Sequence, residues 1–117
     1  LQIWVLPRTR SLKPRWEQRE FSKAERQGRL LPVVSGAAGD TLRIDQDAVI
    51  HIAALDPGQS VTHPLAQGRR AYAFVISGAL ELNSDALAAG DQARITDESR
   101  LVLAASTPTE LILLDLP

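Results

Sequence analysis

The fold class of this chain follows from residues 71–82, which read Ala71-Tyr72-Ala73-Phe74-Val75-Ile76-Ser77-Gly78-Ala79-Leu80-Glu81-Leu82. In the first six positions both the even-numbered and the odd-numbered residues are apolar, which is typical of a strand buried on both faces. Gly78 supplies the backbone freedom that a tight turn needs, and an apolar segment resumes directly after it. The stretch therefore predicts two β-strands joined at Gly78.

Short apolar segments of the same kind continue on both sides of this stretch, with Gly, Pro and Asp between them. A spacing of about 8–12 residues between strands is typical of an antiparallel sandwich or barrel, which is the all-β architecture that we expect. The strands are expected at residues 30–35, 41–44, 48–55, 60–63, 70–77, 79–82, 92–96, 101–105 and 110–116.

The first 30 residues differ from the rest. Residues 1–6 are a short apolar run with alternation that ends at Pro7 and are expected to form a strand, while residues 7–20 are polar and are expected to form an extended connector. A short helix follows, because Ser22 is a suitable N-cap, Glu25 completes a capping box and Gly28 is placed to end the helix. We therefore divide the chain into an N-terminal strand, basic linker and short helix (1–30) and a barrel (31–117).

Composition narrows the class of protein. The 117 residues suit one domain, and 44% hydrophobic with 23% charged residues is normal for a globular protein. No apolar run approaches the roughly 18 residues of a membrane span, so we expect no membrane partner. The absence of Cys excludes disulfides, thiolate metal sites and a Cys nucleophile, and we expect a cytoplasmic location. The chain starts at Leu1 and lacks Met, so we expect it to be a piece of a longer protein.

A net charge of −1 conceals an uneven distribution. Residues 1–30 contain eight basic and three acidic residues, whereas residues 31–117 contain five basic and eleven acidic ones. We expect this basic arm to lie across the acidic barrel, anchored by Trp16 and Phe21. One alternative is that the arm is covered by another domain or a second copy of the chain, which would meet residues 1–6 as an unpaired edge.

A second alternative for the arm is nucleic-acid binding, through phosphate contacts from basic side chains and base stacking on tryptophan. The overall pI of about 6.1 argues against it, and we expect no nucleic-acid partner. The residues concerned are Arg8, Arg10, Lys13, Arg15, Arg19, Trp4 and Trp16.

Several segments resemble the cupin barrel family: the turn at residues 56–58, His63–Pro64, the hairpin at residues 71–82 and the turn at residues 89–91. Together with these, residues 2–7, 13–18, 21–30 and 63–71 look like the middle and second half of pirin-like proteins. They are most similar to the bacterial quercetinase-type branch. This resemblance implies a cupin or jelly-roll barrel that forms the C-terminal domain of a two-barrel protein.

Active cupins bind a divalent metal through His-x-His, a following Glu and a distant His. By resemblance, His63 occupies the first of these positions, while Leu65, Ala71 and Ala93 occupy the other three. The resemblance therefore implies no metal, cofactor or catalytic residue in this domain. It implies a divalent metal (Fe, Mn, Ni or Cu) in the missing N-terminal cupin.

Four polar side chains are candidates for lining a pocket: His51, His63, Tyr72 and Arg70. One alternative has His51 approaching His63 across strands, although each residue has an ordinary structural interpretation that we weigh more heavily. An aromatic residue between apolar ones, such as Tyr72, usually belongs to a core. The Arg69–Arg70 pair could bind an anion but is more often solvated, and Asp45 and Asp47 are expected to bond nearby backbone N–H groups in a turn.

Three functions remain open. The first is a metal-free structural and substrate-excluding C-terminal domain of a pirin-like protein, whose intact form would be a metal-dependent quercetin 2,3-dioxygenase. Its partner would be the missing N-terminal cupin or another copy joined through residues 1–6. The second is a non-catalytic ligand-binding or protein-binding module. The third and weakest is a self-sufficient enzyme in which His51 and His63 share a metal with Glu81 or Asp91.

Overall fold

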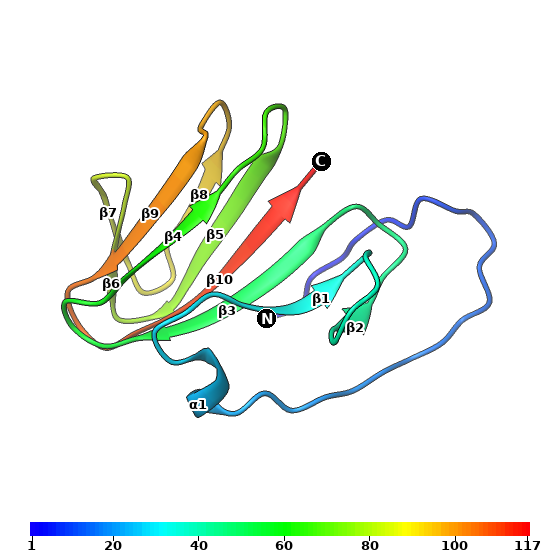
Figure 1. Cartoon of the computed structure of the whole chain (residues 1–117), viewed down its shortest axis with the longest axis horizontal. Coiled ribbons are helices and arrows are strands. Elements are labelled where there is room, and N and C mark those ends of the chain that lie inside the picture. The colour runs from blue at the N-terminus through cyan, green and yellow to red at the C-terminus, as the bar shows by residue number, and fades with distance from the viewer.

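Ten strands and one short helix make up the computed structural model, which describes residues 1–117 (Figure 1). The helix is α1 (Lys23–Arg26). The strands are β1 (Leu31–Ser35), β2 (Leu42–Arg43), β3 (Val49–Leu55), β4 (Ser60–Pro64), β5 (Arg70–Ser77), β6 (Ala79–Leu82), β7 (Asp85–Ala88), β8 (Gln92–Ile95), β9 (Arg100–Ala105) and β10 (Thr109–Leu116).

The strands form two sheets that pack on one another. The larger has the order β2-β1-β3-β10-β5-β8 and the smaller β4-β9-β6-β7. All pairs are antiparallel except β1 with β2, which run parallel over two residue pairs. The predicted antiparallel barrel is therefore confirmed, with one short parallel pair that its alternation pattern did not indicate.

The core lies between the two sheets, because successive side chains of a strand point to opposite faces. Leu101 and Leu103 of the smaller sheet, and Leu111 and Leu113 of the larger one, are fully buried there. Fully burying each such side chain contributes about 1.5–3 kcal/mol. This apolar filling makes the sandwich stable without disulfides.

Gly78 forms the corner at which the chain passes from β5 in one sheet to β6 in the other. Its φ is +88°, and a Cβ at this position would stand 2.2 Å from the carbonyl oxygen of Pro108. Any other residue would be strained and would collide with backbone, so Gly78 is indispensable at this turn. The hairpin expected at residues 71–82 was wrong, because β5 and β6 belong to different sheets and do not pair.

Strand β7 was missed in the sequence, where residues 83–85 were interpreted only as the end of a strand. Asn83 and Ser84 have φ of +45° and +75°, which is the backbone of a two-residue hairpin turn, so the chain reverses at once and β7 pairs with β6. The segment escaped notice because three of its four residues, Asp85, Ala86 and Ala88, have low β-propensity.

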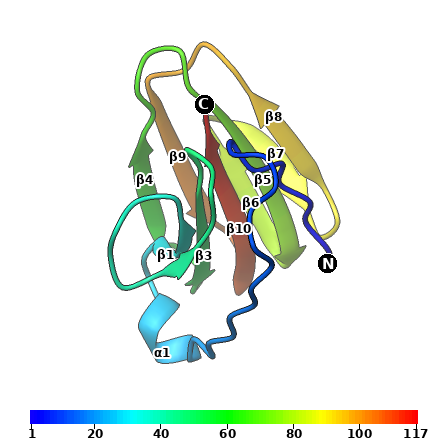
Figure 2. The same cartoon turned by 90° about the vertical axis from the view of Figure 1, so that its right-hand side faces the viewer.

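The prediction of a strand at residues 1–6 was wrong. These residues form no ladder, and the Leu6 carbonyl accepts its hydrogen bond from the Gln46 side chain instead. No sheet edge lies alongside them, because they pass over the outer face of the larger sheet rather than beside it (Figure 2). Alternating polarity alone could not reveal this, since a strand needs a partner.

The arm does contact the body of the protein, at the loop that joins β1 to β3. Arg19 binds Asp40 at 2.5 Å, and the backbone N–H of Thr9 donates to Asp45 at 2.7 Å. Phe21 packs on the apolar outer face of the larger sheet, as expected, but Trp16 is 83% exposed and was wrongly predicted to be an anchor. Polar contacts therefore hold much of the arm against the body of the protein.

The capping box at the helix start is confirmed. The Glu25 N–H donates to the Ser22 hydroxyl at 3.3 Å, and the Ser22 N–H donates to the Glu25 carboxylate at 2.7 Å. The helix ends after Arg26, just before Gly28 with φ +70°. With four residues, α1 is far too short to cross a membrane.

Candidate functional site at the barrel mouth

Three inward-facing polar side chains lie beyond the apolar core at one end of the barrel. His51 shares its side of β3 with Ala53 and Leu55, and His63 projects inward from β4 of the opposite sheet. Asp115 lies near the end of β10, two residues after the buried Leu113. Polar groups therefore replace leucine where the barrel approaches solvent.

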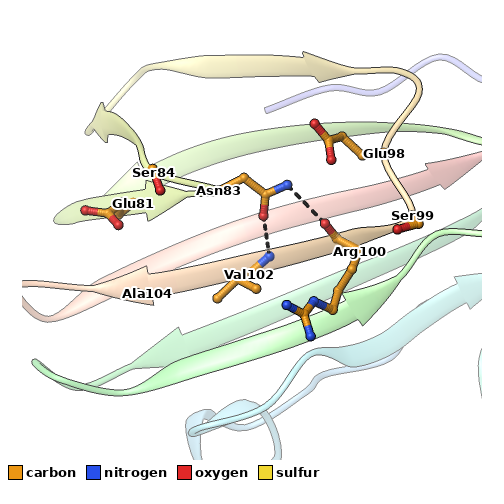
Figure 3. A pocket seen from close by; sticks show the side chains of 8 residues that line it. All are labelled: Glu81, Asn83, Ser84, Glu98, Ser99, Arg100, Val102 and Ala104. Carbon is orange, nitrogen blue, oxygen red and sulfur yellow. Dashed lines mark hydrogen bonds between the residues drawn. The ribbon is translucent and has the colours of Figure 1, made fainter.

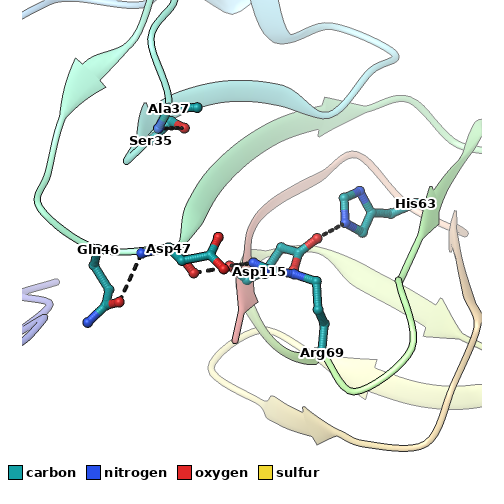
Figure 4. Close-up of polar contacts among 7 residues, drawn as sticks. All are labelled: Ser35, Ala37, Gln46, Asp47, His63, Arg69 and Asp115. Carbon is teal, nitrogen blue, oxygen red and sulfur yellow. Dashed lines mark hydrogen bonds and ion pairs between the residues drawn. The ribbon is translucent and has the colours of Figure 1, made fainter. Parts of the chain in front are cut away.

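Asp115 is the centre of this group, and Figure 4 shows it with His63, Arg69 and Asp47. His63 Nε2 donates to one carboxylate oxygen at 2.8 Å, and Arg69 Nε donates to the other at 2.5 Å. Arg69 also binds the carboxylate of Asp47 at 3.0 Å. We call His51, His63, Arg69 and Asp115 the mouth cluster. Through Asp115 it connects β10 with β4 and with the loop that contains Arg69.

These contacts determine the ionisation states of Asp115 and Arg69. Burial alone would raise the pKa of Asp115, but the hydrogen bonds from Arg69 and His63 outweigh it and hold the pKa below its usual range. The hydrogen bond to Asp115 likewise raises the pKa of Arg69. The carboxylate and the guanidinium therefore remain charged throughout the physiological range.

His51 lies behind His63, with ring centroids 4.9 Å apart in an edge-to-face arrangement. Burial, followed by the adjacent His63, lowers the pKa of His51. Its Nδ1 atom is buried without a hydrogen-bond partner in the protein. The two histidines therefore lie together across the sheets, which the sequence analysis held as the less favoured alternative, and burial favours the neutral form of His51.

The three residues that the family resemblance places at metal-ligand positions, Leu65, Ala71 and Ala93, are apolar and face the same interior. Leu65 and Ala71 are each 3% exposed within the core, and Ala93 packs against that core. None of the three has a donor atom, and both oxygens of Asp115 are already bound by His63 and Arg69. The side chains present do not fit a catalytic metal, and no group of three or more His, Cys, Asp or Glu is placed to hold one.

The structure does not bring together the residues of a self-sufficient cupin enzyme. Glu81 lies on the outer face of β6, on the far side of the smaller sheet from the histidines. Asp91 lies in the turn before β8, where it accepts from the backbone N–H of Ala88 at 2.8 Å. The carboxylate that meets His63 is Asp115, and it is committed to Arg69.

Two of the candidate pocket residues lie outside the barrel interior. Tyr72 is half-buried on the outer face of the larger sheet, beside Leu1 to Trp4, and its hydroxyl donates to Gln92. Arg70 is exposed at the start of β5, beside an open polar hollow. Of the arginine pair, Arg69 is the ordered member, so the expectation that both are solvated was wrong for Arg69.

The roles of Asp45 and Asp47 were also predicted incorrectly. Asp45 receives the N–H of Thr9 from the arm, 36 residues away, and Asp47 binds Arg69, 22 residues away. Both carboxylates therefore bind segments that are distant in the sequence, instead of backbone N–H groups of their own turn.

The outer face of the smaller sheet carries a shallow polar hollow, drawn in Figure 3. Asn83 fixes one side of it: its amide oxygen accepts from the Val102 N–H at 2.8 Å, and its amide nitrogen donates to the Arg100 carbonyl at 3.0 Å. These bonds extend the pairing of β6 with β9 by one residue. Because Asn83 is satisfied by backbone, its role in the hollow is structural.

Sequence reasoning missed Asp115, and it considered Arg69 only as a solvated or anion-binding residue and not as a partner of Asp115. A signal for Asp115 existed, because a single carboxylate stands at an inward-facing position of the apolar strand 110–116. A buried charge of this kind is retained only when it is paired. Nothing in the local sequence identified Arg69 as its partner, because the two are 46 residues apart.

Comparison with known families gives a match over residues 32–116 to the family described as the quercetinase C-terminal cupin domain. Among curated proteins, a pirin-like protein of Caulobacter vibrioides is 34% identical over 116 residues, covering 97% of this chain and 50% of that protein. A quercetin 2,3-dioxygenase of Escherichia coli K12 is 31% identical, covering 99% of this chain and 49% of that protein.

Among solved structures, YhhW from Escherichia coli superposes with a TM-score of 0.91 at 30% identity, over 97% of this chain and 48% of that one. A second YhhW structure, described as a bacterial pirin in complex with nickel(II), gives a TM-score of 0.90 at 31% identity. The chain thus spans about half the length of the relatives that it matches.

Proposed function

This chain belongs to the pirin-like family, as its quercetinase C-terminal cupin domain, and we propose that it acts as the metal-free partner barrel of a two-barrel flavonol dioxygenase. In this proposal the chemistry takes place on a divalent metal in the other barrel. The present domain stabilises that barrel and shields its substrate from water.

The observation that carries this proposal is that residues which the family resemblance places at metal-ligand positions are buried in the apolar core. Leu65 and Ala71 belong to the same buried cluster as Leu101 and Leu113, so the space that a metal and substrate would need is filled. A barrel with a packed interior cannot admit a flavonol, whose binding requires a concave site. Its contribution to a reaction then has to come from its surface.

The names of the relatives support the chemistry assigned to the intact protein. One is a quercetin 2,3-dioxygenase and the YhhW protein was solved with nickel(II). Nickel accepts imidazole and carboxylate ligands and leaves positions open for oxygen or substrate. We place that centre in the half of the protein that this chain does not include, and we place the intact protein in the cytoplasm.

The experiment measures bound metal and quercetin turnover in two proteins: this chain alone, and this chain preceded by the N-terminal half of YhhW. We expect less than one tenth of an equivalent of metal and no turnover in the chain alone, and both properties in the fusion. Stoichiometric metal with turnover in the chain alone would refute the proposal. A His63→Ala variant of the fusion serves as the control and should keep its metal.

A second candidate function, that of a protein-binding module, is favoured by one observation. Trp4 and Leu6 are 86% and 84% exposed, although large apolar side chains are rarely displayed without a partner. Both candidates require a docking surface, and they differ only in whether the partner is the other barrel of the same protein.

A further inference from the structure

We propose that the hollow between the basic arm and the loop that joins β1 to β3 binds a small anion, one with an apolar, ring-sized body and a carboxylate or phosphate head group. We call this hollow the arm hollow, and the side chains that matter most in it are those of Arg8, Leu12, Lys13, Leu42 and Arg43. Neither the metal nor the flavonol of the proposed function takes part, so the inference goes beyond that function.

The arm hollow exists because the arm is fixed to the body at two places and free between them. At the first, the backbone N–H of Arg8 donates to the Asp45 carbonyl at 2.7 Å, and at the second the Arg15 guanidinium donates to the Arg43 carbonyl at 2.6 Å. Residues 10–14 join the two places without a hydrogen bond to the body, and the arm curves away from the sheets there (Figure 1). The hollow that it borders has a volume of about 1020 Å³, which is enough for a small organic molecule.

The charged side chains that line the arm hollow are unbalanced, with four cations and two carboxylates. Both carboxylates already have partners in the protein. Glu17 is bound by Arg15 and by the Arg43 N–H, and Asp45 accepts from the Thr9 N–H at 2.7 Å. Three cationic side chains have no hydrogen bond or ion pair in the protein: those of Arg8, Lys13 and Arg43. They are available to an anion, and a guanidinium matches two oxygens of a carboxylate or phosphate.

The arm hollow also has apolar walls. Val34, Leu42 and Ile44 line it from the edge of the larger sheet and are half-buried. Leu12, which is 48% exposed, lines it from the arm. An apolar ring between these walls removes apolar surface from water, and guanidinium planes stack on such rings. The site therefore favours an anion with an apolar body over an inorganic ion.

Other hollows on the surface lack this combination. The groove beside residues 1–4 is lined by no charged side chain. The hollow beside Arg70 has one hydrophobic residue and two carboxylates, and its Arg69 already binds Asp115. The polar hollow on the smaller sheet has two glutamates and one arginine. Among these hollows, an excess of cations and an apolar wall coincide only beneath the arm.

The test measures binding of 2-naphthoate to the chain by isothermal titration calorimetry, with neutral 2-naphthamide and with acetate as comparisons. We expect 2-naphthoate to bind about tenfold more tightly than either, because only it offers both the charge and the ring. Its binding should weaken between about 50 mM and about 300 mM salt, because exposed charges are screened. Equal binding of 2-naphthamide, or no binding of 2-naphthoate at millimolar concentration, would overturn the inference.

The head group is identified by a parallel titration with 2-naphthyl phosphate. Tighter binding than that of 2-naphthoate assigns a phosphate ligand to the arm hollow, and weaker binding assigns a carboxylate. Either result supports the inference, provided that the neutral 2-naphthamide binds less tightly than both anions.

Matched variants test whether the cations act from the hollow. Lys13→Gln and Arg43→Gln should each weaken 2-naphthoate binding about fivefold, because each removes an unpaired cation and leaves the backbone contacts in place. Arg10→Gln is the control, since Arg10 carries the same charge in the same arm but does not line the hollow. It should change the affinity by less than about twofold, because exposed charges at a distance are screened. Equal losses in all three would assign binding to the diffuse charge of the arm and refute the site. All three side chains are exposed, so each variant should fold.

The apolar wall is tested by Leu12→Ser, which should weaken 2-naphthoate binding about threefold by removing an apolar contact. Leu1→Ser, in the groove beside residues 1–4, is its control and should have no effect. In NMR spectra, 2-naphthoate should shift the amide signals of residues 10–13 and 42–46. Shifts confined to residues 1–4 and 72–74 would place the ligand in the other groove and overturn the inference.

The same titration on the fusion to the N-terminal half of YhhW tests the site in a two-barrel protein. We expect the affinity to be retained and Arg43→Gln to weaken it as in the chain alone. Loss of binding in the fusion would show that the other barrel covers the hollow, and the inference would fail. Metal content and turnover are not read here, so this site and the proposed function can fail separately.

Discussion

The two outer faces of this barrel have opposite chemistry. On the larger sheet, outward residues such as Tyr72, Phe74 and Ile112 are apolar and half-buried. On the smaller sheet, the corresponding positions include Thr62, Glu81 and Arg100, which are exposed. An antiparallel sheet needs only one apolar face for its own core. The apolar residues on the outer face of the larger sheet therefore serve contacts other than the core between the sheets, among them those with Phe21 and the N-terminal segment.

The largest expected effect tests whether the inner faces of the two sheets contribute equally to stability, although their outer faces differ. Leu103→Ala on the smaller sheet and Leu111→Ala on the larger should each lower the free energy of unfolding by about 3–4 kcal/mol, because both side chains are fully buried. Urea denaturation followed by circular dichroism measures both. A difference of more than about 2 kcal/mol between them would show that one sheet is only loosely attached to the core.

Asp115→Asn comes next, because Asp115 links both sheets at the mouth cluster. Asn keeps the size but removes the charge, which leaves Arg69 with only Asp47 as an ionic partner. We expect a loss of about 2 kcal/mol in the free energy of unfolding. Asp91→Asn, at an exposed turn, is the control and should cost under about 1 kcal/mol. Equal losses for the two variants would contradict the linking role.

The pH dependence of stability should follow from the same cluster. The folded protein holds the pKa of His51 below its usual value, so stability is complete above about pH 6.5 and declines as pH falls towards the folded pKa. The lowered pKa of Asp115 adds a second decline, in the same direction, below about pH 4.

Urea midpoints measured between pH 4 and pH 8 give this profile. The variant His51→Gln, which cannot titrate, should have a flatter profile between pH 5 and pH 6.5 than the wild type. An unchanged slope in this variant would assign the decline to other groups.

Asn83→Ala addresses the polar outer face. The substitution removes two hydrogen bonds to β9 and places alanine at a φ of +45°. We expect a loss of about 1–2 kcal/mol, with the loss confined to the β6–β7 hairpin in hydrogen exchange. Ser84→Gly, which relieves a φ of +75° at the neighbouring turn position, is the matched control and should be neutral or stabilising.

The smallest effect concerns the apolar outer face of the larger sheet. Phe21 packs on this face and directly precedes Ser22, the N-cap of α1. Ser22→Ala removes the capping hydroxyl next to Phe21 and should cost about 0.5–1 kcal/mol. Faster proteolysis of the arm at sites before α1 is the corresponding measurement. Ser106→Ala, in an exposed turn, should leave both stability and proteolysis unchanged.

Much of the barrel could be predicted from residues close in sequence. The alternation in residues 71–76, the turn at Gly78 and the capping box at Ser22 all act over a few residues, so their physical consequences are local. The prediction failed at residues 1–6 and 85–88, where strand formation depended on whether a partner lay alongside. The same limit hid Arg69, which has meaning only beside Asp115.

The sequence by itself determined the all-β class, the family resemblance and the apolar identity of the residues that this resemblance places at metal-ligand positions, because each depends on which residue stands where along the chain. Only the tertiary structure decided that Asp115 joins His63 and Arg69, that the first residues cross a sheet face instead of extending an edge, and that the two outer faces differ. These features depend on distances between segments far apart in the chain. Such distances are fixed only when the two sheets pack around their common core.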